Sequence, residues 1–285
     1  MSARVLRGDC LRVLNLQSFA EAGIHEEVTL TFFDPPFNQG KEYAYFNDAA
    51  AREEYWQWVE KVCAGVLGLT VEGGAIYFMQ REKNTEEVFR CLRNTGWTLQ
   101  NLIIWSKHTS AIPSPCRFGK QYQIIAFATK GKRPRLFNRL RIDPPLVRSQ
   151  KKKRADGIFL TDCWNDIREL TSGYFAGDEA LRKPDGQRFH EQQSPLALLA
   201  RIILSSSAPG DLVLDPCAGT GTTLVAAKQL GRTSVGIEVD PANAKKIRSR
   251  LQRIRKTDSI AHLREDYRFT PNLESIWPTG VSAEE

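Results

Sequence analysis

The chain has 285 residues, of which 41% are hydrophobic, so it can bury a large core and is not a disordered chain. Its net charge of +7 suits a polyanionic partner without requiring one. No run of roughly twenty apolar residues could span a bilayer and the amino terminus lacks an apolar signal core, so we expect a cytoplasmic protein. The six cysteines form no Cys-x-x-Cys pair, and we expect no metal site.

Short apolar runs alternate with helical segments over the first 130 residues. The run VTLTFF at 28–33 predicts a buried strand, and apolar residues at helical spacing predict an amphipathic helix over 48–68. The pattern continues with strands at 75–79, 98–105 and 121–129 and a helix over 85–94. The alternation predicts an α/β sheet with helices on its faces, in which the last two strands form an antiparallel pair.

The composition changes after Thr129, and this change divides the chain. Residues 131–186 are rich in Arg, Lys and Pro, and order returns near Ser194 with a helical stripe that ends at Pro209-Gly210. A charged helix is expected beyond Pro241, followed by an irregular tail. We therefore divide the chain into a first half of the main domain at 1–130, a basic insertion at 131–186, a second half at 187–256 and a tail at 257–285.

The run at 212–223, LVLDPCAGTGTT, predicts a strand, a glycine-containing turn and the start of a helix. Glycines let the backbone approach a ligand closely, and a helix start offers free N–H groups. The following strand ends on Glu238, about where a nucleotide-binding βαβ unit places the carboxylate that accepts hydrogen bonds from ribose hydroxyls. Leu224 replaces the third glycine of a dinucleotide loop, and Asp215 could bind an amino group. A plain structural turn is the alternative.

The sequence Asp34-Pro35-Pro36-Phe37 follows the first buried strand, where open α/β sheets usually place catalytic residues. A carboxylate and a rigid proline carbonyl could accept hydrogen bonds from an exocyclic base amine, which is otherwise a poor nucleophile. Phe37 could stack on a base rotated out of a duplex. A sharp turn without chemistry is the alternative, and Asp143-Pro144-Pro145, which lacks the strand and the aromatic residue, is assigned no catalytic role.

The two motifs together resemble the amino-group DNA methyltransferases of restriction-modification systems, in the circularly permuted β arrangement. The resemblance covers residues 1 to about 130 and 187 to about 256. It implies a Rossmann-like, mostly parallel methyltransferase fold with a basic target-recognition insertion, and catalysis by Asp34, Pro35, Pro36 and Phe37. It also implies S-adenosylmethionine as cofactor, bound by Asp9, Cys10, Asp34, Asp215, Cys217, Ala218, Gly219, Thr220, Gly221, Thr222, Thr223, Glu238 and Val239.

One further segment looks like part of this family. Residues 189–195, FHEQQSP, resemble the segment that lies beside the methionine part of the cofactor, although Glu191, Gln192 and Ser194 depart from its pattern. The loop at 38–47 could close over the cofactor and a flipped base, or could be a packed surface loop.

The basic insertion corresponds to the target-recognition region by position only. Neutralising several phosphates would give salt-dependent affinity for duplex DNA without choosing a sequence. The alternative is a solvated charged loop. The residues that we expect to bind DNA are Lys132, Arg133, Arg135, Arg139, Lys151, Lys152, Lys153 and Arg154.

The predicted reaction is methyl transfer to the N6 amine of adenine in duplex DNA, since the resemblance associates Asp at the first motif position with adenine. Cytosine N4 is the nearest competitor, because the same acceptors could activate both amines. An RNA or protein methyltransferase and a non-catalytic DNA-binding module are more distant ones. Carbon-5 methylation would need a nucleophilic cysteine, and neither Pro115-Cys116 nor Pro216-Cys217 has that context. A cognate restriction endonuclease and a homodimer stay open as partners.

Overall fold

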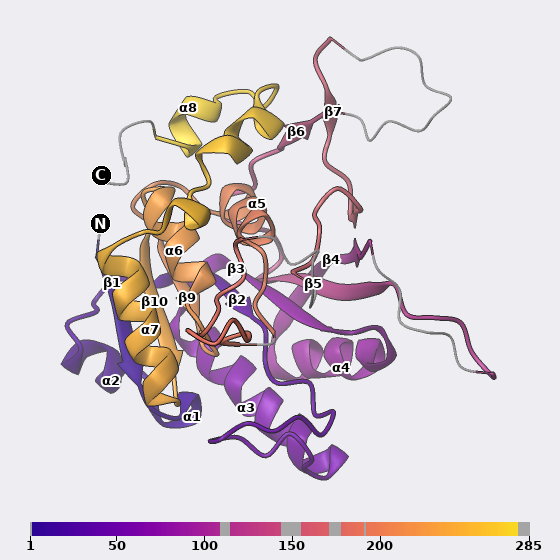
Figure 1. The fold of residues 1–285 in the computed structure, drawn as a ribbon, viewed down its shortest axis with the longest axis vertical. Helices are drawn as coiled ribbons and strands as arrows, with labels where there is room; N and C mark the ends of the chain where they lie inside the picture. The colour runs from indigo at the N-terminus through magenta and orange to yellow at the C-terminus, as the bar shows by residue number, and fades with distance from the viewer. Residues whose placement is uncertain (1, 109–114, 144–154, 171–177, 191, 279–285) are drawn as a thin grey trace.

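The computed structural model describes residues 2–108, 115–143, 155–170, 178–190 and 192–278 of the chain. These ranges contain ten strands and the helices that pack on them (Figure 1). The strands are β1 (Ala3–Arg7), β2 (Val28–Phe33), β3 (Thr70–Arg81), β4 (Trp97–Ser106), β5 (Tyr122–Lys130), β6 (Arg141–Ile142), β7 (Ile158–Phe159), β8 (Cys163–Trp164), β9 (Leu212–Asp215) and β10 (Thr233–Glu238).

Eight of these strands form one sheet in the order β1-β10-β9-β2-β3-β5-β4-β8. All neighbours are parallel except β5, which runs antiparallel to both β3 and β4. The mostly parallel sheet and the antiparallel pair near one edge confirm the predicted fold class. The central strands β2 and β9 belong to the two ends of the sequence, and their pairing joins the two predicted halves into one domain.

Helices cover both faces of the sheet because its central strands are apolar on both sides. One face packs against α1 (Cys10–Val13), α2 (Leu16–Glu21), α3 (Arg52–Leu69) and α4 (Thr85–Thr95). The other face packs against α5 (Leu196–Ser206), α6 (Thr222–Gln229) and α7 (Pro241–Gln252). No helix in the described ranges is both long and apolar enough to cross a membrane.

Two predicted boundaries differ from the structure. The helix expected over 48–68 begins at Arg52, because Asp48 binds the preceding loop instead. Gly73 and Gly74, expected to precede a strand, lie inside β3, which begins directly after α3. Gly73 has φ 74°, and a Cβ there would lie 2.6 Å from the backbone nitrogen of Arg135, so glycine is required where the residues after β5 cross the strand.

The expectation of an irregular tail after residue 256 is wrong for residues 256–278. They form the 3-10 helices η3 (Lys256–Asp258) and η4 (Ala261–Tyr267) and the short helix α8 (Leu273–Ile276). Ile260, Tyr267 and Trp277 are buried in the same core as α5 and α6. The segment lacks a long apolar period, so its order comes from packing of single large side chains and from a buried ion pair.

Asp258 is that ion pair's acid and is fully buried. Its carboxylate binds Arg250 at 2.8 Å and Arg255 at 2.7 Å. Arg250 also donates to the backbone carbonyl of Thr220 at 2.6 Å. The residues after 256 thereby hold the glycine-containing turn that follows β9.

Replacing Asp258 with Ala leaves Arg250 buried without its counter-charge, and we expect the free energy of unfolding to fall by about 3–5 kcal/mol. Asp143→Ala is the matched control, because Asp143 forms an ion pair with Arg268 in which both side chains are substantially exposed. That pair should contribute at most about 1 kcal/mol. Urea unfolding of both variants measures the difference, and equal losses would contradict the proposed importance of the buried pair.

Candidate active site

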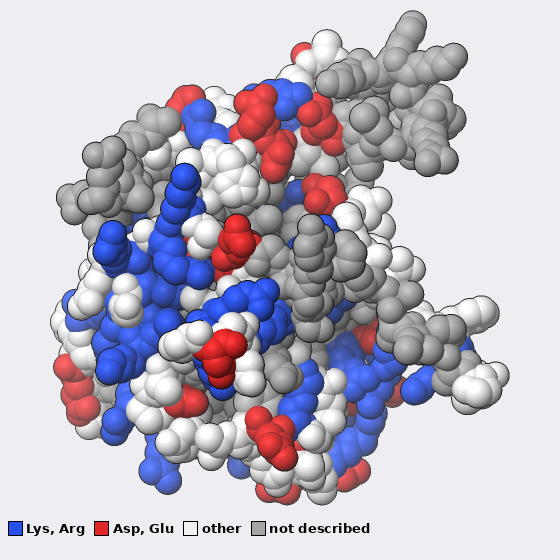
Figure 2. All heavy atoms as spheres, in the orientation of Figure 1, with Lys and Arg blue, Asp and Glu red and all other residues white. Residues whose placement is uncertain are grey.

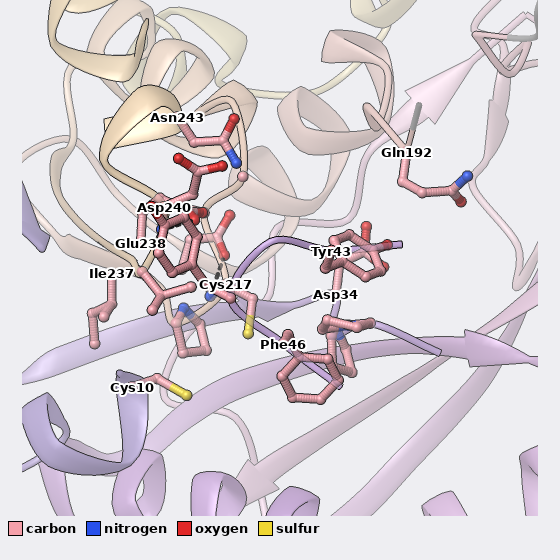
Figure 3. Close-up of a pocket in the computed structure, with 18 of the residues that line it drawn as sticks. Cys10, Asp34, Tyr43, Phe46, Gln192, Cys217, Ile237, Glu238, Asp240 and Asn243 are labelled. Carbon is pink, nitrogen blue, oxygen red and sulfur yellow. Dashed lines mark hydrogen bonds between the residues drawn. The ribbon is translucent and has the colours of Figure 1, made fainter. Parts of the chain in front are cut away.

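A cavity of about 390 Å³ opens at the carboxyl ends of β1, β10, β9 and β2. Open α/β sheets bind ligands at this edge, and the volume lies within the roughly 300–1,000 Å³ typical of small-molecule sites. Figure 3 shows Glu238 and Asp240 on one side of the cavity and Asp34 with Phe46 on the other. The two sides come from segments about 200 residues apart in the sequence.

Asp34 lies just beyond the end of β2, and Asp215 ends the neighbouring strand β9. Ser194 donates a hydrogen bond from Oγ to Oδ2 of Asp34 over 3.1 Å. Burial, with a further contribution from the charge of Asp215, raises the pKa of Asp34 to about 7. Phe37 is buried against the sheet and lines the same cavity.

The two prolines after Asp34 have no N–H groups, so the loop cannot be held by its own donors there. A neighbouring helix supplies one instead, since the hydroxyl of Tyr55 on α3 donates to the carbonyl oxygen of Pro36 at 2.7 Å. Gln80 on β3 donates to the same hydroxyl at 2.9 Å. Tyr55 and Gln80 are both buried, and this relay fixes the orientation of the Pro36 carbonyl.

The other end of the loop is held by Asp48. Its carboxylate accepts hydrogen bonds from the backbone N–H groups of Asn38, Gln39 and Lys41, at 2.7, 3.1 and 3.0 Å. Asn38 has φ 50°, and its side-chain amide donates to the carbonyl of Ala50. The loop is therefore held at Asp34 by Ser194, at Pro36 by Tyr55 and over residues 38–41 by Asp48.

Asp215 orders the glycine-containing turn after β9. Its carboxylate accepts hydrogen bonds from the hydroxyl of Thr223 at 2.5 Å and from the N–H of Cys217 at 3.1 Å. Gly221 has φ 81°, and a Cβ there would lie 2.7 Å from the side chain of Ile247 on α7. Glycine at 221 thus serves the close approach of α6 to α7.

Glu238 ends β10 and accepts a hydrogen bond from the N–H of Asp240 at 2.8 Å. Its backbone carbonyl accepts from the N–H of Gly8 at 3.0 Å, because β1 pairs with β10. This pairing brings Asp9 and Cys10 to the cavity wall. Asp9 also begins α1 by accepting from the N–H of Leu11.

Five carboxyl groups line this cavity, those of Asp9, Asp34, Asp215, Glu238 and Asp240, and three of them have a raised pKa. Burial raises the pKa of Glu238 to about 7 and that of Asp215 to about 6, in addition to the raised pKa of Asp34. Clustered acids with raised pKa values favour a ligand that brings positive charge and hydrogen-bond donors. The apolar side chains of Phe46, Trp58 and Ile237 also line the cavity and can cover a flat ring.

A second, wider cavity of about 1,290 Å³ adjoins the first, and Asp34 and Phe37 line both. Trp105 and Lys107 at the end of β4 and Tyr122 at the start of β5 form its far wall. Burial lowers the pKa of Lys107. The arrangement offers a ligand cavity, a reactive junction at Asp34 and an outer cavity wide enough for a second molecule.

The structure gathers the two predicted motifs around one cavity. All of the residues predicted to bind the cofactor line it except Gly221, and so do all four predicted catalytic residues. The resembling segment before α5 contributes His190, Gln192, Gln193 and Ser194. The loop at 38–47 also contributes Tyr43, Ala44, Tyr45, Phe46 and Asn47, which favours its role as a cover over the site.

The predicted DNA-binding residues are placed differently. Arg135 forms an ion pair with Asp211, which precedes β9, and its backbone meets Gly73 near the start of β3. Lys132 and Arg133 directly precede it, so these three lie by the amino ends of the parallel strands, opposite the cavity. Arg139 stacks over Phe159 at 4.0 Å. Lys151, Lys152, Lys153 and Arg154 lie outside the described residues.

Sequence reasoning missed Tyr55 and Gln80, which hold the catalytic loop. Tyr55 falls on the apolar stripe of a helix and Gln80 lies in a buried strand, so both read as core positions. The one available signal was Gln80 itself, a polar residue in an apolar strand that must find a partner when buried. Asp240 and Asn243, at the start of α7, also line the cavity without having been predicted.

Comparison with known proteins gives a consistent result. The family model N6_N4_Mtase, described as DNA methylase, matches residues 28–248. The Type II methyltransferase M.HinfI of Haemophilus influenzae is 28% identical over 88% of this chain and 68% of its own length. The DNA adenine methyltransferase YhdJ of Escherichia coli (strain K12) is 29% identical over 80% and 76%.

The fold is also found in solved structures. That of PvuII DNA methyltransferase, described as cytosine-N4-specific, has a TM-score of 0.62 at 18% identity and covers 96% of this chain and 94% of the other. The putative DNA modification methylase TTHA0409 from Thermus thermophilus has a TM-score of 0.57 at 25% identity, over 87% and 94%.

Proposed function

The chain belongs to the N6_N4_Mtase family of DNA methylases, and on this basis we propose that it methylates the N6 amine of adenine in duplex DNA with S-adenosylmethionine as donor. The observation that carries the proposal is the position of Asp34 and Phe37. They form the junction between a small cavity lined by five carboxyl groups and a wide outer cavity.

The small cavity fits S-adenosylmethionine by its chemistry. Asp215 and Asp34 can face the cationic methionine end, Glu238 can accept hydrogen bonds from ribose hydroxyls, and the apolar wall can cover adenine. When bound, this cofactor supplies a methyl group on a positively charged sulfur. Solved relatives of this fold include M1.HpyAVI as a SAM complex and TTHA0409 complexed with S-adenosyl-L-methionine.

At the junction, the ionised carboxylate of Asp34 accepts a hydrogen bond from the target amine. The carbonyl oxygen of Pro36 is engaged by Tyr55, so we assign the second acceptor to the carbonyl of Pro35. Both hydrogen bonds strengthen as positive charge develops on the amine nitrogen, which lowers the barrier for transfer. Phe37 offers its ring to the flipped base.

Adenine is favoured over cytosine by Asp34 at the first motif position and by the resemblance to YhdJ, a DNA adenine methyltransferase. Cytosine N4 is the second candidate, because its amine presents the same two protons to the same acceptors. A cognate restriction endonuclease and a homodimer remain predictions.

The decisive experiment is to express the chain in a methylation-deficient bacterium and to sequence the genomic DNA for modified bases. We expect N6-methyladenine in one short recurrent context. The Asp34→Ala variant should lower the rate by at least about 10²–10³-fold, since it loses an acceptor that acts in the transition state. Asp143→Ala, in the second Asp-Pro-Pro sequence, should keep full activity.

Methylation of cytosine N4 would select the second candidate. Unchanged turnover by Asp34→Ala would contradict the assigned role of that residue. If purified protein binds S-adenosylmethionine but modifies no DNA base, the substrate belongs to another class.

The rate should depend on pH through Asp34, because only the ionised carboxylate accepts the amine's hydrogen bond. With cofactor and DNA both limiting, we expect the rate to rise over roughly pH 6 to 8, around the pKa of about 7. Saturation with the cofactor, which brings positive charge, should move the midpoint to lower pH.

Ser194→Ala gives the matched test. The Ser194 hydroxyl stabilises the ionised carboxylate and lowers the pKa of Asp34, so its loss should move the midpoint to higher pH. If the midpoint of the pH–rate curve is the same in Ser194→Ala as in the parent, the pH dependence comes from a group other than Asp34.

The Gln80–Tyr55 relay predicts a positioning role. Tyr55→Phe frees the Pro36 carbonyl, and we expect kcat to fall by about three- to tenfold, as for one lost hydrogen bond, with little change in cofactor Kd. Tyr77→Phe is the control, because Tyr77 donates to or accepts from Ser206 at 2.8 Å in the core and lines neither cavity of the site. Single-turnover rates and cofactor titration measure both. Equal effects of the two variants on kcat would indicate a merely structural role.

A further inference from the structure

The segment that runs through and just beyond α7, residues 241–256, contains seven Lys and Arg residues and no Asp or Glu. Two of the seven are structural, since Arg250 and Arg255 both bind the buried carboxylate of Asp258. Lys245, Arg248, Arg253 and Lys256 are exposed. We propose that these four residues, the basic ridge, bind the phosphate backbone of duplex DNA outside the target base pair.

The ridge is a feature of the surface as well as of the sequence. Ala244, Ile247 and Leu251 turn the other side of α7 into the core, which leaves the cations on the outer side. Figure 2 shows Lys and Arg gathered over the position that α7 occupies in Figure 1. This is a different part of the molecule from the insertion at 131–186.

The ridge begins beside the site. Asp240 and Asn243, at the start of α7, line both the cofactor cavity and the outer cavity. The helix has 12 residues and therefore extends about 18 Å from this rim. Duplex DNA carries one charge per about 1.7 Å of its axis, so several phosphates fall within that length. If a duplex places its target base at Asp34, the base pairs beside the target could therefore run along α7.

A solvated surface helix usually mixes acids with bases, so that residues three or four positions apart attract one another. On α7, Lys245 and Arg248 lie three positions apart and repel each other, and the segment supplies no acid to offset this. Such repulsion costs about 0.2–0.5 kcal/mol per pair. A bound polyanion removes this cost, which a solvated surface would retain.

The inference rests on the proposed function, since it names part of the path of the DNA substrate. The test uses the full chain with Lys245, Arg248 and Arg253 all changed to Glu. The control changes Lys61, Arg90 and Arg93 to Glu, which are exposed on α3 and α4 and give the same change of net charge. The probe is a 30-base-pair duplex of random sequence, because phosphate contacts do not depend on sequence.

We expect the ridge variant to bind the duplex at least about tenfold more weakly at 0.1 M salt. The slope of log affinity against log salt should become less negative by about 2–3, as for three lost phosphate contacts. A second variant with Gln at the same three positions should show the same slope. Cofactor Kd and melting temperature should stay at the parent's values, and the control should change the slope by less than about 1.

Equal effects in the ridge variant and the control would overturn the inference, because they would reflect net charge alone. Equal dependence on the ridge for a single-stranded RNA of the same length would overturn the assignment to duplex DNA. Methyl transfer to unmodified genomic DNA is measured in parallel. If the unmodified protein transfers no methyl group to DNA, the proposed function is contradicted. If it does transfer methyl groups and the ridge variant binds the duplex as tightly as the unmodified protein, only the inference about the basic ridge is contradicted.

Discussion

The parallel pairing of β2 with β9 is the contact on which the site depends. It sets Thr31 opposite Leu214, so that Asp34 and Asp215 emerge at the same edge from strands about 180 residues apart. Burial raises the pKa of Asp34, and the electrostatically unfavourable proximity of Asp215 raises it further. Under the proposed function, a cationic cofactor bound beside the two acids would turn this repulsion into attraction. The same pairing places cofactor chemistry and base chemistry side by side.

The two loops of the site are held in place by residues outside the predicted catalytic and cofactor-binding sets. Asp258 lies beyond the family's matched range, yet its ion pair with Arg250 holds the carbonyl of Thr220 in the cofactor turn. Tyr55 holds the second of two prolines that have no donors of their own, and Asp48 holds the residues that follow them. Both turns are thus held by contacts from other parts of the fold.

Positive charge is distributed over more of the molecule than the basic insertion. One predicted DNA contact, Arg135, forms an ion pair with Asp211 by the amino ends of the strands, while α7 presents exposed charge beginning at the rim of the cavities. A cluster of Lys and Arg in the sequence therefore gives candidates for phosphate binding. Which of them can face a substrate depends on their position relative to the carboxyl edge of the sheet, where the site lies.

The sequence by itself determined the fold class and both motifs, and all but one of the residues predicted to bind the cofactor line the cavity. The reason is that strand periodicity, glycine turns and acids at strand ends are local signals. It did not determine the relay from Gln80 through Tyr55 to Pro36, the partnership of Ser194 with Asp34, or the order of residues 256–278. Each of these depends on groups from separate elements that meet through hydrogen bonds or burial, as Tyr267 meets Arg201 on α5. No local pattern encodes such contacts, since a buried Tyr on an apolar stripe looks the same whether its hydroxyl meets a catalytic loop or the core.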